Sequence, residues 1–364
     1  MTSKTWKVGI VGYGLSAKVF HIPFINALPE FTLYAIVQRN PREGNDAAKD
    51  FPTVKCFRDQ EDLFQDSMVD VVVISTPTDS HFPLVKSALL AQKHVVCEKP
   101  FTRTASEADE LVALADAEQK LLTVFHNRRW DTDFVTLVEL MNNGALGQVT
   151  EYETRFEFPH IKQAVQNLPI VTIANAQINA VYDLGTHLLD QAVQIFGFPQ
   201  RVTGFIGDQT QEEGSSESNN IFTVLMHYEN DVLVTAKAGR ISPDEKPLRF
   251  SVGGDKGSFK KFYMDIQKEH IMVGKFPGDA GFGLEPVERY EILPAEKNDG
   301  SVYQEMIKTV QRPPTWAEYY RKLAYALSGQ GAVPVSGAEA RDIIRIIELA
   351  LQSSKLGESL AFSR

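Results

Sequence analysis

Short apolar runs alternate with amphipathic stretches through the first third of the chain. The runs are rich in β-branched residues, are bounded by turn residues, and lie at residues 8–11, 33–37, 54–57, 69–75, 94–97 and 121–125. Between them, helical spacing of apolar positions covers residues 16–27, 80–91 and 106–119, and Ser80 and Thr104 or Ser106 are candidate caps. Alternating strands and helices with fully buried strands predict an α/β domain built on a parallel, doubly wound sheet.

The pattern changes after about residue 126. Apolar and polar positions then alternate as in half-exposed antiparallel strands, over residues 148–158, 201–206, 220–228, 232–238, 248–252 and 258–262. Helical patterns are confined to residues 130–141, 183–196, 316–328 and 338–354. Asn230-Asp231 predicts a hairpin turn, residues 208–220 a polar loop, and residues 266–300 an irregular segment. We therefore expect an α/β domain over residues 1–126 and a sheet-rich α+β domain over residues 127–364.

Length and composition favour a two-domain protein of a reducing compartment. A chain of 364 residues, 43% of them hydrophobic, exceeds one ordinary core. The sequence has no apolar run of about twenty residues that would span a membrane, and its N-terminus has no secretory apolar region. Since Cys56 and Cys97 are the two cysteines, we expect no disulfide framework and a cytoplasmic location. The net charge of −10 disfavours a general affinity for nucleic acid.

The first strand–helix junction carries a phosphate-binding signature. Gly12 permits a tight turn, Gly14 lets the backbone approach a pyrophosphate, and the small Ala17 lets the helix pack on the strand. Leu15 and Ser16 complete the turn, where free N–H groups and the positive helix end attract phosphate. A merely tight turn is the alternative, but the position at the first strand–helix junction predicts a dinucleotide site.

The end of the second strand bears on the choice of cofactor. An acidic residue there would bind the ribose 2′-hydroxyl of NAD. The residue at this position is the neutral Gln38, which we expect to contact the cofactor. Arg39, with Arg42, offers guanidinium groups to a 2′-phosphate, so we expect NADP(H) rather than NAD(H). An ordinary exposed turn residue is the alternative interpretation of Arg39. Further cofactor contacts are expected beyond the strand at residues 69–75, from Thr76, Pro77 and His81.

The strand at residues 94–97 is followed by Glu98-Lys99-Pro100, and ligands of doubly wound folds bind beyond such strand ends. Desolvation and the positive charge of an oxidised nicotinamide would favour the neutral form of Lys99 and suit it to proton transfer. Glu98 would orient Lys99 or hold ribose hydroxyls. A strand-end lysine considered by itself is more often a surface ion-pair residue.

A second group of candidate residues opens the helical pattern at residues 183–196. Asp183 and His187 stand four apart, so both project from one helix face, where they form a plausible acid/base pair. Tyr182 precedes them and is a candidate substrate contact. A structural role for the pair is equally compatible with the spacing. No third residue of suitable spacing suggests a metal site.

A third cluster follows the strand at residues 121–125. Asn127 and Arg128 are candidates to bond cofactor or substrate oxygens, and Trp130 could form a wall of the substrate site. The alternative is a domain junction in which the arginines pair with Asp131 and Asp133.

Taken together, Gly12-x-Gly14, Glu98-Lys99-Pro100 and Asp183-x-x-x-His187 resemble the Gfo/Idh/MocA family of glucose–fructose oxidoreductase and inositol dehydrogenase. The segments HNRRWDTDF (126–134) and YDLGTHLLDQ (182–191) are similar to its NADP-dependent scyllo-inositol dehydrogenase branch. The resemblance implies a Rossmann domain, then a domain with a large open, mostly antiparallel sheet, with C-terminal residues packing back on the first domain.

The resemblance also bears on chemistry and assembly. It implies that Lys99, Asp183 and His187 form the catalytic group, and that Lys99 or His187 exchanges the hydroxyl proton. It further implies a cis bond between Lys99 and Pro100, and homodimers or dimers of dimers that pair through the sheet face.

One stretch departs from that branch. Residues 148–184 contain no Gly, and residues 159–181, expected to line the substrate pocket, contain no Arg or Trp. The inositol substrate is therefore not transferred. The prediction is an NADP(H)-dependent oxidoreductase acting on a secondary alcohol or carbonyl of a sugar, polyol or related small molecule. The alternatives are a catalytically silent NADP-binding regulator, like the galactose-pathway repressor, and a dihydrodiol or xylose dehydrogenase-like enzyme.

Overall fold

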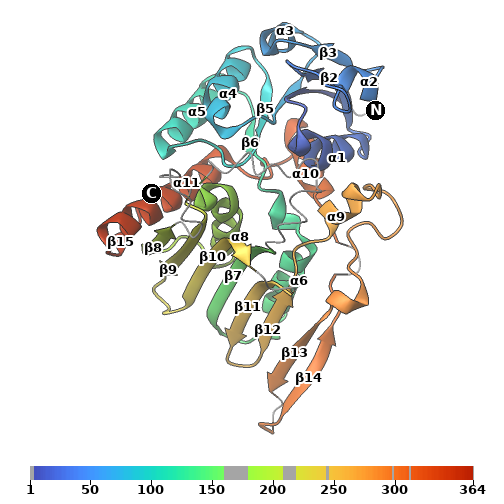
Figure 1. The fold of residues 1–364 in the computed structure, drawn as a ribbon. Coiled ribbons are helices and arrows are strands. Elements are labelled where there is room, and N and C mark those ends of the chain that lie inside the picture. The colour runs from blue at the N-terminus through green and yellow to red at the C-terminus, as the bar shows by residue number, and fades with distance from the viewer. Residues whose placement is uncertain are drawn as a thin grey trace. The chain divides into compact units, whose positions relative to one another are not determined.

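The computed structural model of the chain has two compact units (Figure 1). The structure describes residues 4–159, 179–207, 219–242, 246–296, 299–310 and 313–363. The first unit comprises Met1–Trp130, Gln267–Phe282 and Pro314–Ile344. The second comprises Asp131–Ile266, Gly283–Pro313 and Arg345–Arg364. Each unit has a sheet of its own and is described by itself.

Six parallel strands form the sheet of the first unit, in the order β3-β2-β1-β4-β5-β6. Their bounds are Trp6–Val11 (β1), Phe31–Val37 (β2), Lys55–Phe57 (β3), Val71–Ile74 (β4), His94–Cys97 (β5) and Leu122–Val124 (β6). The strand order reverses between β1 and β4, which is where open α/β sheets bind their ligands. The predicted parallel, doubly wound sheet is confirmed.

Helices cover both faces of this sheet. The helices of the first unit are η1 (a π-helical turn, Ala17–His21), α1 (Ile22–Asn26), α2 (Ala47–Asp50), α3 (Gln60–Gln65), η2 (Thr78–Ser80), α4 (His81–Leu90), α5 (Ala105–Ala117), η3 (Asn127–Trp130), α9 (Gln267–Met272) and α10 (Ala317–Leu327). Helix α11 (Gly337–Leu356) begins in the first unit and ends in the second. Figure 1 shows α4 and α5 on one side of the sheet and α1 and α10 on the other. Strand β4, with neighbours on both sides, is accordingly buried along its whole length.

Local capping explains where several of these helices begin. Thr104 caps α5 and forms a capping box with Glu107, which agrees with the predicted cap. Helices α2 and α3 were not predicted, because they have only four and six residues, too few for a hydrophobic period. Each starts at an aspartate, Asp46 or Asp59, whose carboxylate accepts a backbone N–H of the first turn.

Aromatic side chains of α10 complete the core of the first unit. Tyr319 and Tyr320 are fully buried, and the ring of Tyr319 lies 4.7 Å from that of Phe125 in an edge-on arrangement. The Tyr319 hydroxyl also lies 3.0 Å from Thr123 Oγ1 on β6. A segment late in the sequence is therefore part of the core on which β5 and β6 rest.

The second unit contains a seven-stranded sheet in the order β12-β11-β7-β10-β9-β8-β15. The bounds are Val149–Pro159 (β7), Arg201–Gly207 (β8), Ile221–His227 (β9), Leu233–Ser242 (β10), Leu248–Gly254 (β11), Ser258–Phe262 (β12) and Leu360–Ala361 (β15). Strands β7 and β10 pair in parallel, and the other pairs are antiparallel. The predicted α+β unit with a mostly antiparallel sheet is confirmed.

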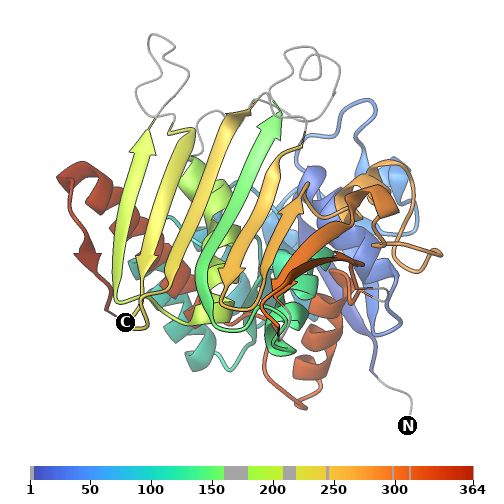
Figure 2. The ribbon, with the colours of Figure 1, turned by 90° about the horizontal axis from the view of Figure 1, so that it is seen from below.

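The helices of the second unit pack on one face of its sheet. They are α6 (Thr132–Asn142), η5 (a π-helical turn, Val181–Gly185), α8 (Thr186–Phe196) and the end of α11; the short η6 (Val287–Arg289) lies further along the chain. Side chains of α11 bond β8 directly, since Ser353 and Ser354 accept backbone N–H groups of Gly204 and Ile206 at 3.0 Å. Figure 2 shows these helices behind strands β7 to β11, and in the described residues the near face carries no helix.

Two turn and loop predictions have different outcomes. The Asn230-Asp231 turn is confirmed between β9 and β10, with Asp231 at a φ of +57°. The irregular segment over residues 266–300 is wrong in part, because it contains α9 and the strand β13 (Glu291–Glu296), which pairs with β14 (Val302–Ile307). Pro294 inside β13 and the exposure of β14 remove the alternating pattern that would have revealed this hairpin. Most of the predicted polar loop, residues 208–218, lies outside the described residues.

Candidate active site

The turn after β1 has the geometry of a phosphate-binding turn. Gly12 has a φ of +103°, and a Cβ there would lie 2.3 Å from the carbonyl oxygen of Ser75 at the end of β4. A Cβ on Gly14 would meet no described atom within 4 Å, so space remains beside the turn. Leu15 packs on the core of the unit and Ala17 is fully buried in it. The turn therefore fits a dinucleotide, whose pyrophosphate needs close approach to the backbone.

The helix after this turn begins with the π-helical turn η1. The single helix predicted over residues 16–27 is divided into η1 and α1. Such turns are rare and often lie at functional sites. The last residue of η1 is His21, which is fully buried. Its Nε2 lies 3.0 Å from Glu98 Oε1, and its Nδ1 lies 2.6 Å from the Tyr320 hydroxyl.

The Glu98 carboxylate is the centre of this network. The Ser16 hydroxyl donates to Oε1, which also faces His21, and the backbone N–H of Lys99 donates to Oε2 at 3.0 Å. Burial raises the pKa of the Glu98 carboxyl, but the bond and charge of His21, the charge of Lys99 and the bond from Ser16 outweigh it and bring this pKa to about 2. Glu98 is therefore an ionised, buried carboxylate at neutral pH.

Lys99 stands directly beyond β5, as predicted. It is half-buried, and the bond to its following residue Pro100 is cis, as the resemblance implied. The chain thus links the glycine turn to this lysine through one carboxylate, because Glu98 is bonded both by Ser16 and by the Lys99 backbone.

His81 has a structural position. Its Nε2 lies 2.9 Å from the carbonyl oxygen of Thr76 and its Nδ1 lies 2.9 Å from that of Pro100. Burial lowers the pKa of His81, against the effect of these carbonyls. Since both nitrogens face backbone carbonyls, no ring nitrogen is left for the predicted cofactor contact. Thr76 and the exposed Pro77 remain at the strand end, where a cofactor would pass.

Gln38 also has a structural position. It is buried, and its amide bonds the backbone of its own loop: Nε2 donates to Asn45 and Oε1 accepts from Ala47, both at 2.8 Å. Its side chain therefore does not reach out as the prediction required. Instead it fixes the loop that carries Arg39 and Arg42.

The arginines of this loop are well placed for an anionic group. Arg39 and Arg42 are exposed, and in the described part of the chain their guanidinium groups have no hydrogen bond or ion pair. Arg58 was missed by the sequence analysis; it follows β3 and donates to the Gln38 carbonyl at 2.9 Å. A usable signal existed, because β2 and β3 are parallel neighbours and their ends lie at one edge.

The turn η3 contains the third predicted cluster. Asn127 and Arg128 are buried, and the buried Trp130 packs its ring 5.9 Å from that of Tyr319. Trp130 therefore belongs to the core of the first unit and does not form the predicted wall. Among the ion pairs of this segment, Arg129 pairs with Glu339 at 3.0 Å, a partner that the alternative interpretation did not name.

In the second unit, η5 and α8 carry the other predicted group. Asp183 lies in the π-helical turn η5 and is half-buried, whereas Tyr182 and His187 are buried. Asn179 opens the turn, and its side-chain oxygen accepts the backbone N–H of Val181 at 3.1 Å. Because a π-helical turn closes its bonds five residues apart, Asp183 and His187 fall within one turn.

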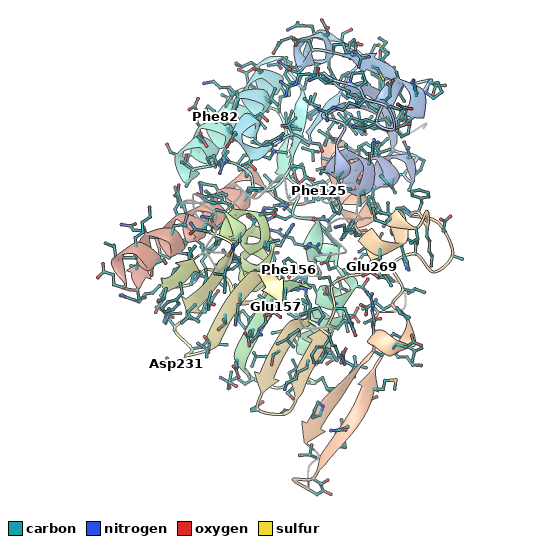
Figure 3. All side chains as sticks on the ribbon, in the orientation of Figure 1. Phe82, Phe125, Phe156, Glu157, Asp231 and Glu269 are labelled. Atoms are coloured by element: carbon teal, nitrogen blue, oxygen red, sulfur yellow. The ribbon has the colours of Figure 1, made fainter. Side chains whose placement is uncertain are left out.

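A buried cation beneath α8 was missed by the sequence analysis. Arg249 on β11 is only 1% exposed, and Phe156 lies 4.5 Å from its guanidinium carbon and 6.2 Å from the His187 ring (Figure 3 labels Phe156). The guanidinium donates to three elements at 2.5–3.1 Å: Gln191 on α8, Thr154 on β7 and Asp133 on α6. This network fixes the helix that carries His187. Its members are separated too widely in sequence to form a motif.

Other predicted features have a limited counterpart in the structure. Residues 160–178, most of the segment expected to line the substrate pocket, lie outside the described residues. Among the described residues, no group of three or more His, Cys, Asp or Glu side chains is arranged to hold a metal ion. None of the described helices is both long and apolar enough to cross a membrane.

Comparison with known proteins agrees with this geometry. Residues 6–126 match the oxidoreductase family with an NAD-binding Rossmann fold, and residues 134–260 match the GFO/IDH/MocA C-terminal domain. The uncharacterized oxidoreductase YdgJ of Escherichia coli is 35% identical, with 96% of each chain covered. The scyllo-inositol 2-dehydrogenase (NADP(+)) IolW of Bacillus subtilis is 32% identical over 96% of this chain and 94% of its own. The YPO2259 putative oxidoreductase from Yersinia pestis superposes with a TM-score of 0.88 at 33% identity, over 100% of this chain and 99% of that one.

Fold, glycine turn and strand-end lysine together define an NAD(P)-dependent oxidoreductase, and the expected action on CH–OH groups is confirmed at this level. The chain belongs to the Gfo/Idh/MocA family.

Proposed function

We propose that this chain is an NADP(H)-dependent enzyme that interconverts a secondary alcohol and a carbonyl on a sugar, a polyol or a related small molecule. The observation that carries the proposal is the pair of bonds to Glu98. One ionised carboxylate holds Ser16 of the glycine turn and the backbone of Lys99, so a cofactor-binding turn and a candidate proton carrier are fixed together.

The cofactor is assigned to residues of the first unit. The turn would hold the pyrophosphate, and Glu98 and the neighbouring strand ends would hold the nicotinamide ribose. These residues are Gly12, Gly14, Leu15, Ser16 and Ala17 for the pyrophosphate, and Glu98, Thr76, Pro77 and Asn127 for the ribose and nicotinamide.

A preference for NADP(H) is supported by charge. The exposed guanidinium groups of Arg39 and Arg42, with Arg58 beside them, suit a 2′-phosphate. The position directly after β2, where a carboxylate would bind a free 2′-hydroxyl, holds no acidic residue. The relative IolW carries NADP(+) in its name.

The chemistry is assigned to Lys99, Asp183 and His187. A bound nicotinamide would supply the hydride chemistry, accepting a hydride from the alcohol carbon or donating one to the carbonyl carbon. As the C=O bond forms, the hydroxyl proton must pass to a base, and Lys99 or His187 serves this role. Asp183 orients the substrate, and Arg128 and Tyr182 bind its oxygens. Lys99→Met and His187→Gln separate the two carriers: the variant that removes the proton carrier loses turnover, and its pH–rate profile loses one limb.

Binding and turnover test the proposal in sequence. All three tryptophans, Trp6, Trp130 and Trp316, belong to the first unit, so their fluorescence reports NADPH binding there. We expect tighter binding of NADPH than of NADH, and absorbance change at the nicotinamide band with some polyols or aldoses. Absence of NADPH binding would overturn the proposal, and NADPH binding without turnover of any substrate would favour a silent regulator.

Assembly and location complete the proposal. We propose a homodimer or a dimer of dimers that pairs through the helix-free face of the second unit's sheet, where Phe205 and Leu233 are 61% and 48% exposed. Light scattering of the purified protein should give an even multiple of 40.7 kDa, and Phe205→Glu should lower it. The free cysteines Cys56 and Cys97 support a reducing compartment, the cytoplasm.

A further inference from the structure

His21 is a fully buried histidine with a polar partner on each ring nitrogen. Glu98 Oε1 lies 3.0 Å from Nε2 and the Tyr320 hydroxyl lies 2.6 Å from Nδ1. Because Glu98 is ionised and can only accept, Nε2 must carry a hydrogen. While the ring is neutral, Nδ1 then accepts the hydroxyl hydrogen of Tyr320, and when the ring is protonated Nδ1 donates to the Tyr320 oxygen, so every group in the chain of bonds is satisfied in either state. Tyr320 thereby selects the tautomer that donates to Glu98.

The imidazole ring is held in a fixed orientation. Its centroid lies 4.3 Å from that of Phe125, a residue that Figure 3 labels. Tyr320 packs edge-on at 6.3 Å from the same ring. With its ring fixed in this way, His21 fixes the direction of its Nε2–H bond.

That direction determines how Glu98 can meet a ligand. A carboxylate has about four acceptor positions. Oε1 faces two donors, Ser16 and His21, and Oε2 accepts from Lys99. The remaining position belongs to a carboxylate whose side chain is still 9% exposed. We propose that His21, set by Tyr320, is the positioning residue that orients Glu98 so that this last acceptor position receives a hydroxyl of the bound cofactor. The inference rests on the proposed function, because its readout is nicotinamide cofactor binding.

Two substitutions at one position separate positioning from packing. In His21→Gln, the side-chain amide nitrogen takes the place of Nε2 and can still donate to Glu98. In His21→Asn, the shorter amide takes the place of Nδ1 and can bond only on the Tyr320 side. We expect His21→Asn to weaken NADPH binding by about 10- to 100-fold, the value of a hydrogen bond to a charged group, and His21→Gln to stay within about 3-fold of wild type.

A second matched pair tests the tautomer. Tyr320→Phe removes the hydroxyl that faces His21, whereas Tyr319→Phe removes a neighbouring buried hydroxyl that bonds Thr123 instead. We expect Tyr320→Phe to weaken NADPH binding by about 3- to 10-fold, because Nε2 is then no longer the fixed donor. Tyr319→Phe should leave it unchanged.

Each dissociation constant is measured by NADPH fluorescence titration, with tryptophan fluorescence of the free protein as the check on folding. The inference also predicts a higher KM for NADPH in His21→Asn, with kcat at saturating NADPH changed by less than about 3-fold. Equal binding by His21→Asn and wild type overturns the inference, as does an equal loss in His21→Asn and His21→Gln. If wild type itself does not bind NADPH, the proposed function fails instead.

Discussion

Each unit places a candidate functional residue in a π-helical turn, but the two turns differ in whether the side chain of that residue is buried. In η1 the polar side chain of His21 points into the core and supports a carboxylate. In η5 the neighbours Tyr182 and Leu184 are buried, while Asp183 keeps part of its side chain exposed. The same wide turn therefore serves two roles. Under the roles that we propose, the residue that positions the cofactor-binding carboxylate is enclosed, whereas the residue that meets the substrate stays accessible to it.

The largest expected effect is on the second turn. Asp183→Asn should lower kcat by about 10²- to 10⁴-fold, because it removes the charge that we propose orients the substrate and the acid/base pair. NADPH binding, a property of the first unit, should stay within about 3-fold. Steady-state kinetics and NADPH titration measure the two separately. Asp231→Asn, at a hairpin turn where asparagine also tolerates the positive φ, is the matched control. If Asp183→Asn lost NADPH affinity as well as kcat, the proposal that the two turns have separate roles would be contradicted.

The helix behind the second turn should depend on its buried cation. Arg249→Met leaves Asp133 without its partner in the core, which should destabilise the second unit by about 3–5 kcal/mol. Urea unfolding followed by circular dichroism measures the loss, while tryptophan fluorescence follows the first unit alone. Arg155→Met, which removes a pair of partly exposed salt bridges, should cost less than about 1 kcal/mol. Equal stability of the two variants would show that the Arg249 network does not hold α8.

The first turn should make stability depend on acid through Glu98. Its folded pKa of about 2 lies below the ordinary 4.5, so its stabilisation is complete above pH 4.5 and is lost as the pH falls toward 2. The shift corresponds to about 3 kcal/mol for this buried group. Urea unfolding by tryptophan fluorescence should therefore show a stability gap between wild type and Glu98→Gln that narrows by about this amount between pH 5 and pH 2. If the stability gap between wild type and Glu98→Gln stayed the same from pH 5 to pH 2, His21 and Ser16 would not lower the pKa of Glu98.

The smallest effect is expected at the loop that Gln38 holds. Arg39→Ala should weaken NADPH binding by about 10-fold, because one charge-assisted contact to the 2′-phosphate is lost at an exposed site. NADH binding should not change, and Arg321→Ala on the surface of α10 should affect neither cofactor. Fluorescence titration with both cofactors decides the point. An equal loss for NADH would remove the proposed role of Arg39.

Much of the first unit was predictable because buried parallel strands are short, apolar and bounded by turns. The strand at residues 94–97 and the residues that follow it are found as predicted. The π-helical turn was not predictable, because the apolar positions from Ala17 to Ile25 fit one helix as well as two. In the second unit, the alternation that revealed β9 is absent from β14, whose side chains are mostly exposed.

The candidate site was predictable where its residues are adjacent in the sequence. The prediction failed where the hydrogen-bond partners lie far apart in the sequence. Glu98 and Lys99 are adjacent in sequence, and their strand end identifies them. His21 lies among apolar residues and resembles an ordinary core position, and its partners Glu98 and Tyr320 are 77 and 299 residues away. Gln38 was assigned to the cofactor because of its position, whereas its short-range bonds to the loop decide its conformation.

The bond between His21 and Tyr320 also limits how early the first unit can finish folding during synthesis. It joins residues 299 positions apart, so the first unit cannot complete its core until α10 has been synthesised. At a translation rate of about 5–20 residues per second, that delay is on the order of 15–60 s after His21 emerges. During this interval the N-terminal sheet lacks the aromatic residues of α10 that complete its core. A nascent chain released before α10 would lack the bond from Tyr320 to His21, the residue that we propose orients Glu98. Cofactor binding would then distinguish chains that contain α10 from shorter ones.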